Sequence, residues 1–147
     1  FSAVNDFAAP APTATNPYPV SPWTAFLATP SGGADQVLTL SFSPLKFPPW
    51  TRGKTISATS MTLFTVGWQP GNFVVAPLAP LPAAQLVMNP VAGVTEPNVC
   101  SANIGLPPGT SLGTWSFELQ LQGAADFRSL SKSQIGDLII VINFSAT

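Results

Sequence analysis

The sequence contains no histidine, one cysteine and few charged residues. Without histidine, the chain lacks the most common general base and the most common metal ligand of proteins. The lone Cys100 excludes an internal disulfide, a multi-cysteine zinc site and a CxxC redox pair. Only 7% of the residues are charged, whereas an ordinary domain has about 25%. With five basic residues and a net charge of −1, the basic footprint of a nucleic-acid-binding protein is also missing.

Long apolar runs are absent too. The longest, residues 138–142, has the length of a strand and falls far short of the roughly 20 residues of a membrane span. A helical bundle is excluded by 17 prolines and 11 glycines, and a disordered chain by four tryptophans and ten phenylalanines. At 147 residues we expect one domain. Residues 1–22 are rich in Pro and Ala, which predicts an extended arm or linker. The sequence is expected to be a processed chain or a piece of a longer one. Residues 23–147 are expected to form a single β domain.

Alternating apolar residues predict the strands. Residues 36–43 and 114–122 alternate cleanly, so each is expected to bury one face. Along residues 54–68 the apolar phase slips twice, after Ala58 and after Leu63, which predicts a bulge or bend. Residues 137–144 are continuously apolar, as in a strand covered on both faces. Together these segments predict an all-β fold, an antiparallel β-sandwich or open barrel of about eight strands with Pro/Gly-rich loops.

No motif in the chain points to catalysis. Any two of the carboxylates could meet in space, but nothing in their spacing indicates it. Structural or solvated roles are expected for all six: Asp6, Asp35, Glu96, Glu118, Asp126 and Asp137. A serine nucleophile would need a lysine base, and no Gly-X-Ser-X-Gly is present. Cys100 is expected to be a small buried hydrophobe. The sequence therefore predicts no enzyme, no cofactor and no metal site.

The tryptophans are the most informative side chains. Trp68 and Trp115 lie on alternating strands and are expected in the core. Trp23 and Trp50 lie in proline-rich segments, which are usually at the surface, and Arg52 follows Trp50 closely. Exposed Trp and Arg are favoured at the centres of protein interfaces. Trp50, Arg52 and Trp23 are therefore the candidate binding residues, and the competing interpretation is that each Trp covers an edge of the core.

The C-terminal third carries a family resemblance in three segments. They are Gly-Thr-Trp-Ser-Phe-Glu-Leu at 113–119, Asp-Phe-Arg-Ser-Leu at 126–130, and Ile-Gly-Asp-Leu-Ile-Ile-Val-Ile-Asn-Phe-Ser-Ala at 135–146. This order resembles the C-terminal end of Tc toxin A subunits, from the bacterial ABC insecticidal toxin complexes. The matching positions are Trp115, Leu119, Phe127, Arg128, Ile135, Asp137, Leu138, Ile140, Ile142 and Phe144.

The resemblance implies a specific function. In such toxins this domain binds the B subunit and belongs to a secreted homopentamer that forms the translocation channel. It docks the β-propeller of the B–C cocoon onto that channel. We therefore expect a secreted, non-enzymatic assembly module with a protein partner, no nucleic acid and no membrane span in this segment.

Two other functions fit the same composition. A carbohydrate-binding or adhesin-type β-sandwich would use Trp23 and Trp50 as stacking platforms for sugar rings. A surface domain of a non-enveloped virus capsid would share the Pro/Thr richness and the β architecture. Both stay open at the level of the sequence.

Overall fold

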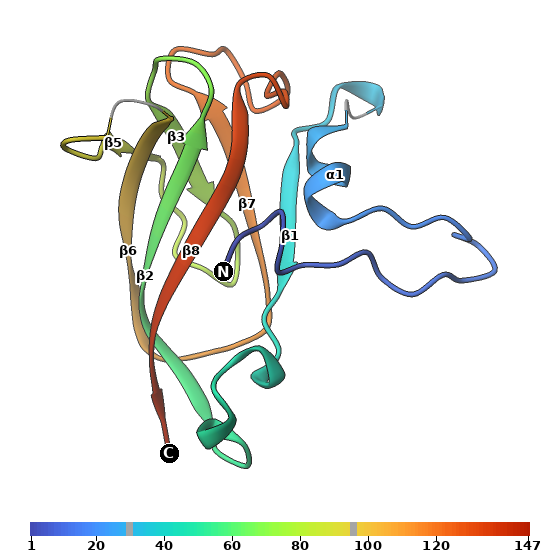
Figure 1. Ribbon diagram of the computed structural model, residues 1–147, viewed down its shortest axis with the longest axis vertical. Coiled ribbons are helices and arrows are strands. Elements are labelled where there is room, and N and C mark those ends of the chain that lie inside the picture. Colours follow the sequence, from blue (N-terminus) through green and yellow to red (C-terminus); the bar gives the residue numbers. More distant parts are fainter. Residues whose placement is uncertain (29–30, 95–96) are drawn as a thin grey trace.

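The computed structural model describes residues 1–28, 31–94 and 97–147. It is a sandwich of two four-stranded antiparallel sheets (Figure 1). One sheet has the strand order β1-β7-β3-β4 and the other β5-β6-β2-β8. The strands are β1 (Val37–Ser41), β2 (Ile56–Gly67), β3 (Phe73–Pro77), β4 (Leu86–Val87), β5 (Asn89–Pro90), β6 (Asn98–Ser111), β7 (Thr114–Leu121) and β8 (Ile135–Ala146). The predicted β-sandwich is confirmed.

Helical segments are short. Those in the described part of the chain are α1 (Pro22–Leu27) and three 3-10 turns, η1 (Ser31–Gly33), η2 (Pro44–Lys46) and η3 (Pro49–Thr51). Proline stands in the first turn of α1, η2 and η3, where its fixed φ suits a helix start. The Ser21 hydroxyl caps α1 by accepting from the Thr24 amide at 3.2 Å. No helix among the described residues is long and apolar enough to cross a membrane.

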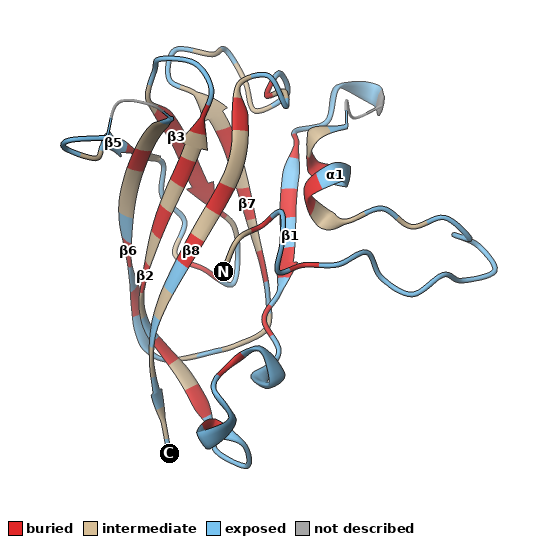
Figure 2. Ribbon diagram, viewed as in Figure 1, coloured by how far each residue is buried: buried red, intermediate tan, exposed pale blue. Residues whose placement is uncertain are grey.

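The core lies between the two sheets (Figure 2). Leu38, Leu40 and Phe42 of the predicted strand at 36–43 are all buried, as their alternation indicated. The same holds for Trp115 and Phe117 on β7. The buried face of each of these two strands therefore follows directly from the alternation of apolar residues in the sequence.

The long strand β2 contains one of the two predicted phase slips. The register with both β6 and β8 shifts between Ala58 and Ser60, which is the expected bulge. The second slip does not occur, because the buried phase continues through Thr65 and Gly67. Trp68 therefore falls on the outer side and is 62% exposed, so its predicted core position is wrong.

The prediction for residues 137–144 is also corrected. β8 is an edge strand, and its outer face is partly open, with Val141 exposed and Ile139 half-buried. Only its inner side chains, such as Leu138 and Ile140, are fully covered. A continuous apolar run marks this strand although one of its faces is partly exposed.

The N-terminal segment differs from the expected arm. Residues 8–20 form an irregular, almost entirely exposed stretch, but Ala3 and Phe7 are buried in the core. Phe1 exchanges two backbone hydrogen bonds with Ile140, and Ser2 bridges to Ile139. The first seven residues therefore pack as part of the β domain, because their apolar side chains fill the gap beside β8.

Candidate functional site

Trp50 lies on η3 at one end of the sandwich and is 62% exposed. Its ring stacks on Phe144 of β8, with 5.9 Å between the ring centroids and 22° between the planes. Phe47 meets the same Phe144 edge-on at 4.9 Å. An exposed tryptophan that is held from below by packed aromatic rings loses little conformational freedom on binding. We call Trp50, Phe144, Phe47, Arg52 and Lys54 the Trp50 cluster.

The local sequence explains why Trp50 is presented in this way. The consecutive prolines 48 and 49 prevent a strand here and start the η3 turn. The buried Thr51 ties the turn together, since its amide and its hydroxyl both donate to the Pro48 carbonyl, at 2.9 and 2.7 Å. Gly53 then reverses the chain with φ of 76°, a conformation that favours glycine. The indole is thus fixed by the backbone around it.

Positively charged residues lie beside the exposed indole. The Lys54 ammonium lies over the Trp50 ring, 5.7 Å from its centroid. Arg52 follows in the same turn and is exposed. Within the described part of the chain the single ion pair joins Arg128 to Asp35, so neither Lys54 nor Arg52 is neutralised there by a carboxylate. The Trp50 cluster is therefore an aromatic and cationic surface.

The aromatic packing continues from this surface into the core. Ring contacts lead from Trp50 through Phe144 and Phe47 to Phe1, at centroid distances of 5.9, 4.9 and 5.5 Å. Phe1 in turn contacts Phe42 at 5.4 Å, and Phe42 contacts the fully buried Trp115 at 4.9 Å. Edge-on and offset ring pairs each add about 1 kcal/mol beyond burial. The Trp50 cluster is anchored to the centre of the sandwich by this series.

The structure separates the three candidate residues. Trp50 and Arg52 are both exposed and neighbours on one turn. Trp23 is 8% exposed and packs against Phe26 at 5.6 Å, so its predicted surface exposure is wrong. It lies in α1, which turns its apolar side toward β1. Trp23 thus covers an edge of the core.

Sequence reasoning missed Phe144 and Lys54 as members of the site. Phe144 belongs to β8, whose apolar run gave no indication that a loop from residues 44–54 would cover its end. Lys54 stands next to the start of β2, and no spacing rule links it to Trp50. Only the meeting of η3 with the last residues of β8 brings them together.

The carboxylates form no catalytic pair among the described residues; Glu96 lies outside them. Asp137 accepts from the Ser2 hydroxyl at 2.6 Å and from the Val4 and Leu138 amides, so it fastens the N-terminal segment. Asp35 is bound to Arg128 at 2.9 Å. These are structural roles, as expected. Nowhere in residues 1–28, 31–94 and 97–147 do three or more potential metal ligands gather.

Burial changes the titration of two groups. Desolvation raises the pKa of the half-buried Glu118 carboxyl, and the negative charge of Asp35 raises it further. Desolvation likewise raises the pKa of the Cys100 thiol, against smaller opposing effects of its polar neighbours, chiefly the Phe73 backbone and the Asn98 side chain. A raised thiol pKa disfavours the reactive thiolate, so the buried Cys100 fits the small hydrophobe that was expected.

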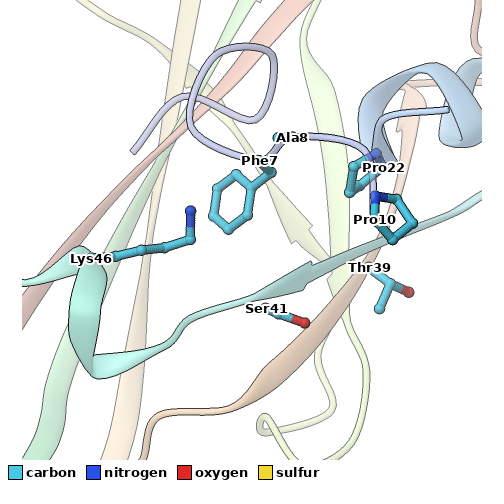
Figure 3. Close-up of a pocket in the computed structure, with 7 residues that line it drawn as sticks. All are labelled: Phe7, Ala8, Pro10, Pro22, Thr39, Ser41 and Lys46. Atoms are coloured by element: carbon cyan, nitrogen blue, oxygen red, sulfur yellow. The ribbon is translucent and has the colours of Figure 1, made fainter. Parts of the chain in front are cut away.

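A pocket of about 490 Å³ opens between the N-terminal segment and β1 (Figure 3). Its walls are Phe7, Ala8, Pro10 and Pro22, and its polar groups come from Thr39, Ser41 and Lys46. The two hydroxyls also bond to Ser116 and Thr114 on β7, at 3.0 and 3.1 Å. The Lys46 ammonium donates to the Asp6 carbonyl and lies 4.5 Å from the centre of the Phe7 ring. The volume suits a small ligand that accepts hydrogen bonds.

Comparison with known proteins identifies no relative: no family model, no curated protein and no solved structure matches this chain.

Proposed function

We propose that this chain is a non-enzymatic assembly module that docks a partner protein through the Trp50 cluster. The observation that carries the proposal is an indole that is 62% exposed yet stacked on Phe144, with the Lys54 ammonium over its ring and the exposed Arg52 two residues further along. Among the described residues, neither cation forms an ion pair. Exposed tryptophan and arginine in a rigid setting are the residue types that dominate binding energy at interfaces. A specific contact needs about 800 Å² on each partner, which is about a tenth of the 7952 Å² accessible surface of this chain.

The resemblance of residues 113–146 to Tc toxin A subunits names the first partner to test. That partner is the B subunit β-propeller of a B–C cocoon, and the parent chain would then be a pentamer. Phe144 is both the last aromatic position of the resemblance and the ring that supports Trp50. The proposal therefore places the docking surface at the end of the family-like segment.

The test is a calorimetric titration of residues 1–147 with the B–C component of the same toxin locus. Trp50→Ala is expected to weaken binding by more than about tenfold. Trp68→Ala is the matched control, because Trp68 is equally exposed but lies at the opposite end of β2. Equal binding by wild type and Trp50→Ala would overturn the Trp50 cluster as the docking surface. Absence of binding by the wild type, also when the chain is displayed on a pentameric scaffold, would overturn the assignment of the partner.

A carbohydrate-binding function is the second candidate, and the pocket beside β1 favours it. Hydroxyls, an ammonium group and an aromatic wall are groups that recognise sugars and their acidic derivatives. Trp50 supports this reading less, because Phe144 covers one face of its ring. Titration with neutral and acidic monosaccharides at millimolar concentration tests it, with Lys46→Ala as the variant. Amide shifts at Thr39 and Ser41 would support this function, and unchanged spectra would exclude it.

A further inference from the structure

The C-terminal half of β8, residues 141–146, lies at an open edge of the sheet formed by the described residues. On one side β8 pairs with β2 along its whole length, from Ile135 to Ala146. On its other side, the described residues that pair with it are those at the N-terminus, where Ser2 stands opposite Ile139. Figure 1 shows the N-terminus beside the middle of β8 and the strand continuing past it to the C-terminus. Among the described residues, residues 141–146 therefore pair with a strand on one side only.

The hydrogen-bond pattern shows which backbone groups are left on this edge. Phe1 exchanges both of its backbone bonds with Ile140, so even-numbered residues of β8 direct their N–H and C=O groups outward. Thr147 exchanges two backbone hydrogen bonds with Thr55, so the odd-numbered residues of β8 direct their N–H and C=O groups toward β2. By this alternation the outward groups beyond Ile140 belong to Ile142, Phe144 and Ala146. Such a row of donors and acceptors is a template for another strand.

We propose that the partner docks by strand addition: an extended segment of the partner protein pairs antiparallel with residues 141–146 of β8. The segment would continue the line of residues 1–3, which already occupy the same edge in that direction. Main-chain bonds supply affinity in this mode of recognition, and side chains at alternate positions supply specificity. This inference rests on the proposed docking function and specifies how the partner binds.

The surroundings of the edge define the chemistry of the segment. The Phe1 ring contacts Phe47, and Phe47 contacts Phe144, so the inward side chains of an added strand meet aromatic rings. A partner segment with apolar residues at alternate positions fits against these rings. Lys54 and Arg52 of the Trp50 cluster form no ion pair with any carboxylate of the described residues. A partner segment with acidic residues at its N-terminal end complements that charge, because this end of an antiparallel strand lies beside Ala146 and residues 54–55.

The same charges select against a second copy of this chain. Antiparallel pairing of two β8 edges around Phe144 would bring the Trp50 clusters of both copies to one seam. Lys54 and Arg52 of each copy would then face their counterparts, and like charges directly across an interface are unfavourable. A partner of opposite charge is therefore the occupant to which the structure points.

The probe is a capped peptide with two N-terminal glutamates followed by alternating valine and threonine. Its binding is followed by amide hydrogen exchange measured by NMR on residues 1–147. The expected result is that exchange slows by about tenfold or more at Ile142, Phe144 and Ala146, while the amides of Asn143 and Ser145, already bonded to β2, change little. A peptide with N-methylated valines should give no protection, and one with lysines in place of the glutamates should give less. No slowing at these three amides at millimolar peptide would overturn the proposal.

Two variants complete the test on the protein side. Ala146→Pro removes one outward N–H and is expected to weaken peptide binding by about tenfold, whereas the matched Ala146→Val keeps that donor and should bind as the wild type does. A chain extended before Phe1 by a short Val/Thr repeat should fill the edge itself and block the peptide. Equal binding by Ala146→Pro and Ala146→Val would overturn strand addition. Self-association of the wild type with protection of the same amides would assign the edge to a second copy instead.

The outcomes for the B–C component separate this inference from the docking function itself. If Trp50→Ala weakens docking and Ala146→Pro does not, the docking function stands and strand addition fails. If neither variant affects docking, the proposed function fails as well. If both weaken docking and Ala146→Val does not, both proposals are supported.

Discussion

Trp50 and Phe144 come from distant parts of the sequence, yet their rings stack at 5.9 Å and 22°. One belongs to a proline-rich 3-10 turn and the other to the last residues of an edge strand. The stack joins the segment at residues 44–54 to the end of β8 and holds the indole at the surface. The aromatic series behind it extends to the buried Trp115.

Truncating Phe144 tests this support. Phe144→Ala should lower the free energy of unfolding by about 2 kcal/mol, less than for a fully buried ring because Phe144 is half-buried. Urea unfolding followed by far-UV circular dichroism gives the value. Trp68→Ala removes a ring that is as exposed as Trp50 and lies at the other end of β2. This variant should lower the free energy of unfolding much less. Equal losses in the two variants would contradict an anchoring role for Phe144.

Gln36 is a second structural link with a measurable effect. Its buried amide donates to the Phe26 and Leu130 carbonyls at 3.1 and 2.9 Å and accepts from the Leu130 amide at 2.9 Å. Gln36→Leu leaves those backbone groups buried without partners, so we expect a loss of about 2–3 kcal/mol. Urea unfolding measures the loss. A stability equal to that of the wild type would show that water replaces the amide at no cost.

Gly136 lies directly beneath the Trp68 ring. A Cβ atom added there would stand 2.5 Å from Cζ2 of the indole, so Gly136→Ala must displace the ring. Because Trp68 is exposed and free to swing outward, the cost should stay below about 1 kcal/mol. The near-UV circular dichroism of Trp68 should change, and the difference should vanish when Gly136→Ala is made in a Trp68→Ala background. A large loss of stability in that background would place the strain in the backbone.

The raised pKa of Glu118 predicts a pH dependence of stability. The folded state keeps the Glu118 proton to higher pH than the unfolded chain, whose carboxyl has the ordinary value of 4.5. Stability from this group is therefore complete at acid pH and is lost as pH rises through the raised pKa. Glu118→Gln should be more stable than the wild type at neutral pH and equal to it in acid, as measured by urea unfolding across that range. A variant that is less stable at neutral pH would mean that the ionised carboxylate is favourable in the fold.

Most local features of the fold follow from the sequence. Alternation placed Leu38, Leu40 and Phe42 inside, and the broken phase after Ala58 marked the bulge in β2. The inward face and the bulge both depend on the order of residues within one strand. The errors concern contacts with other segments: Trp68 depends on the phase that β2 keeps beside β8, and Trp23 on how α1 packs against β1.

The candidate site was predictable only in part. Proline-rich surroundings indicated an exposed Trp50 and Arg52, because such loops run over the surface. The same rule failed for Trp23, since its proline starts a short helix whose apolar side covers the core. The support by Phe144 and the charge of Lys54 depend on contacts between segments far apart in the chain.

By itself, the sequence determined the β class, the inward face of most strands, the bulge and the lack of histidine or multi-cysteine chemistry. Composition and a period of two are sufficient for these, because they reflect which residues share a face. Only the tertiary structure decided that β8 is an edge strand, that residues 1–3 pair with residues 138–140 of that edge, and that Trp50 stands over Phe144. Strand order and loop packing are set by long-range burial of apolar surface, which leaves no periodic mark in any one segment.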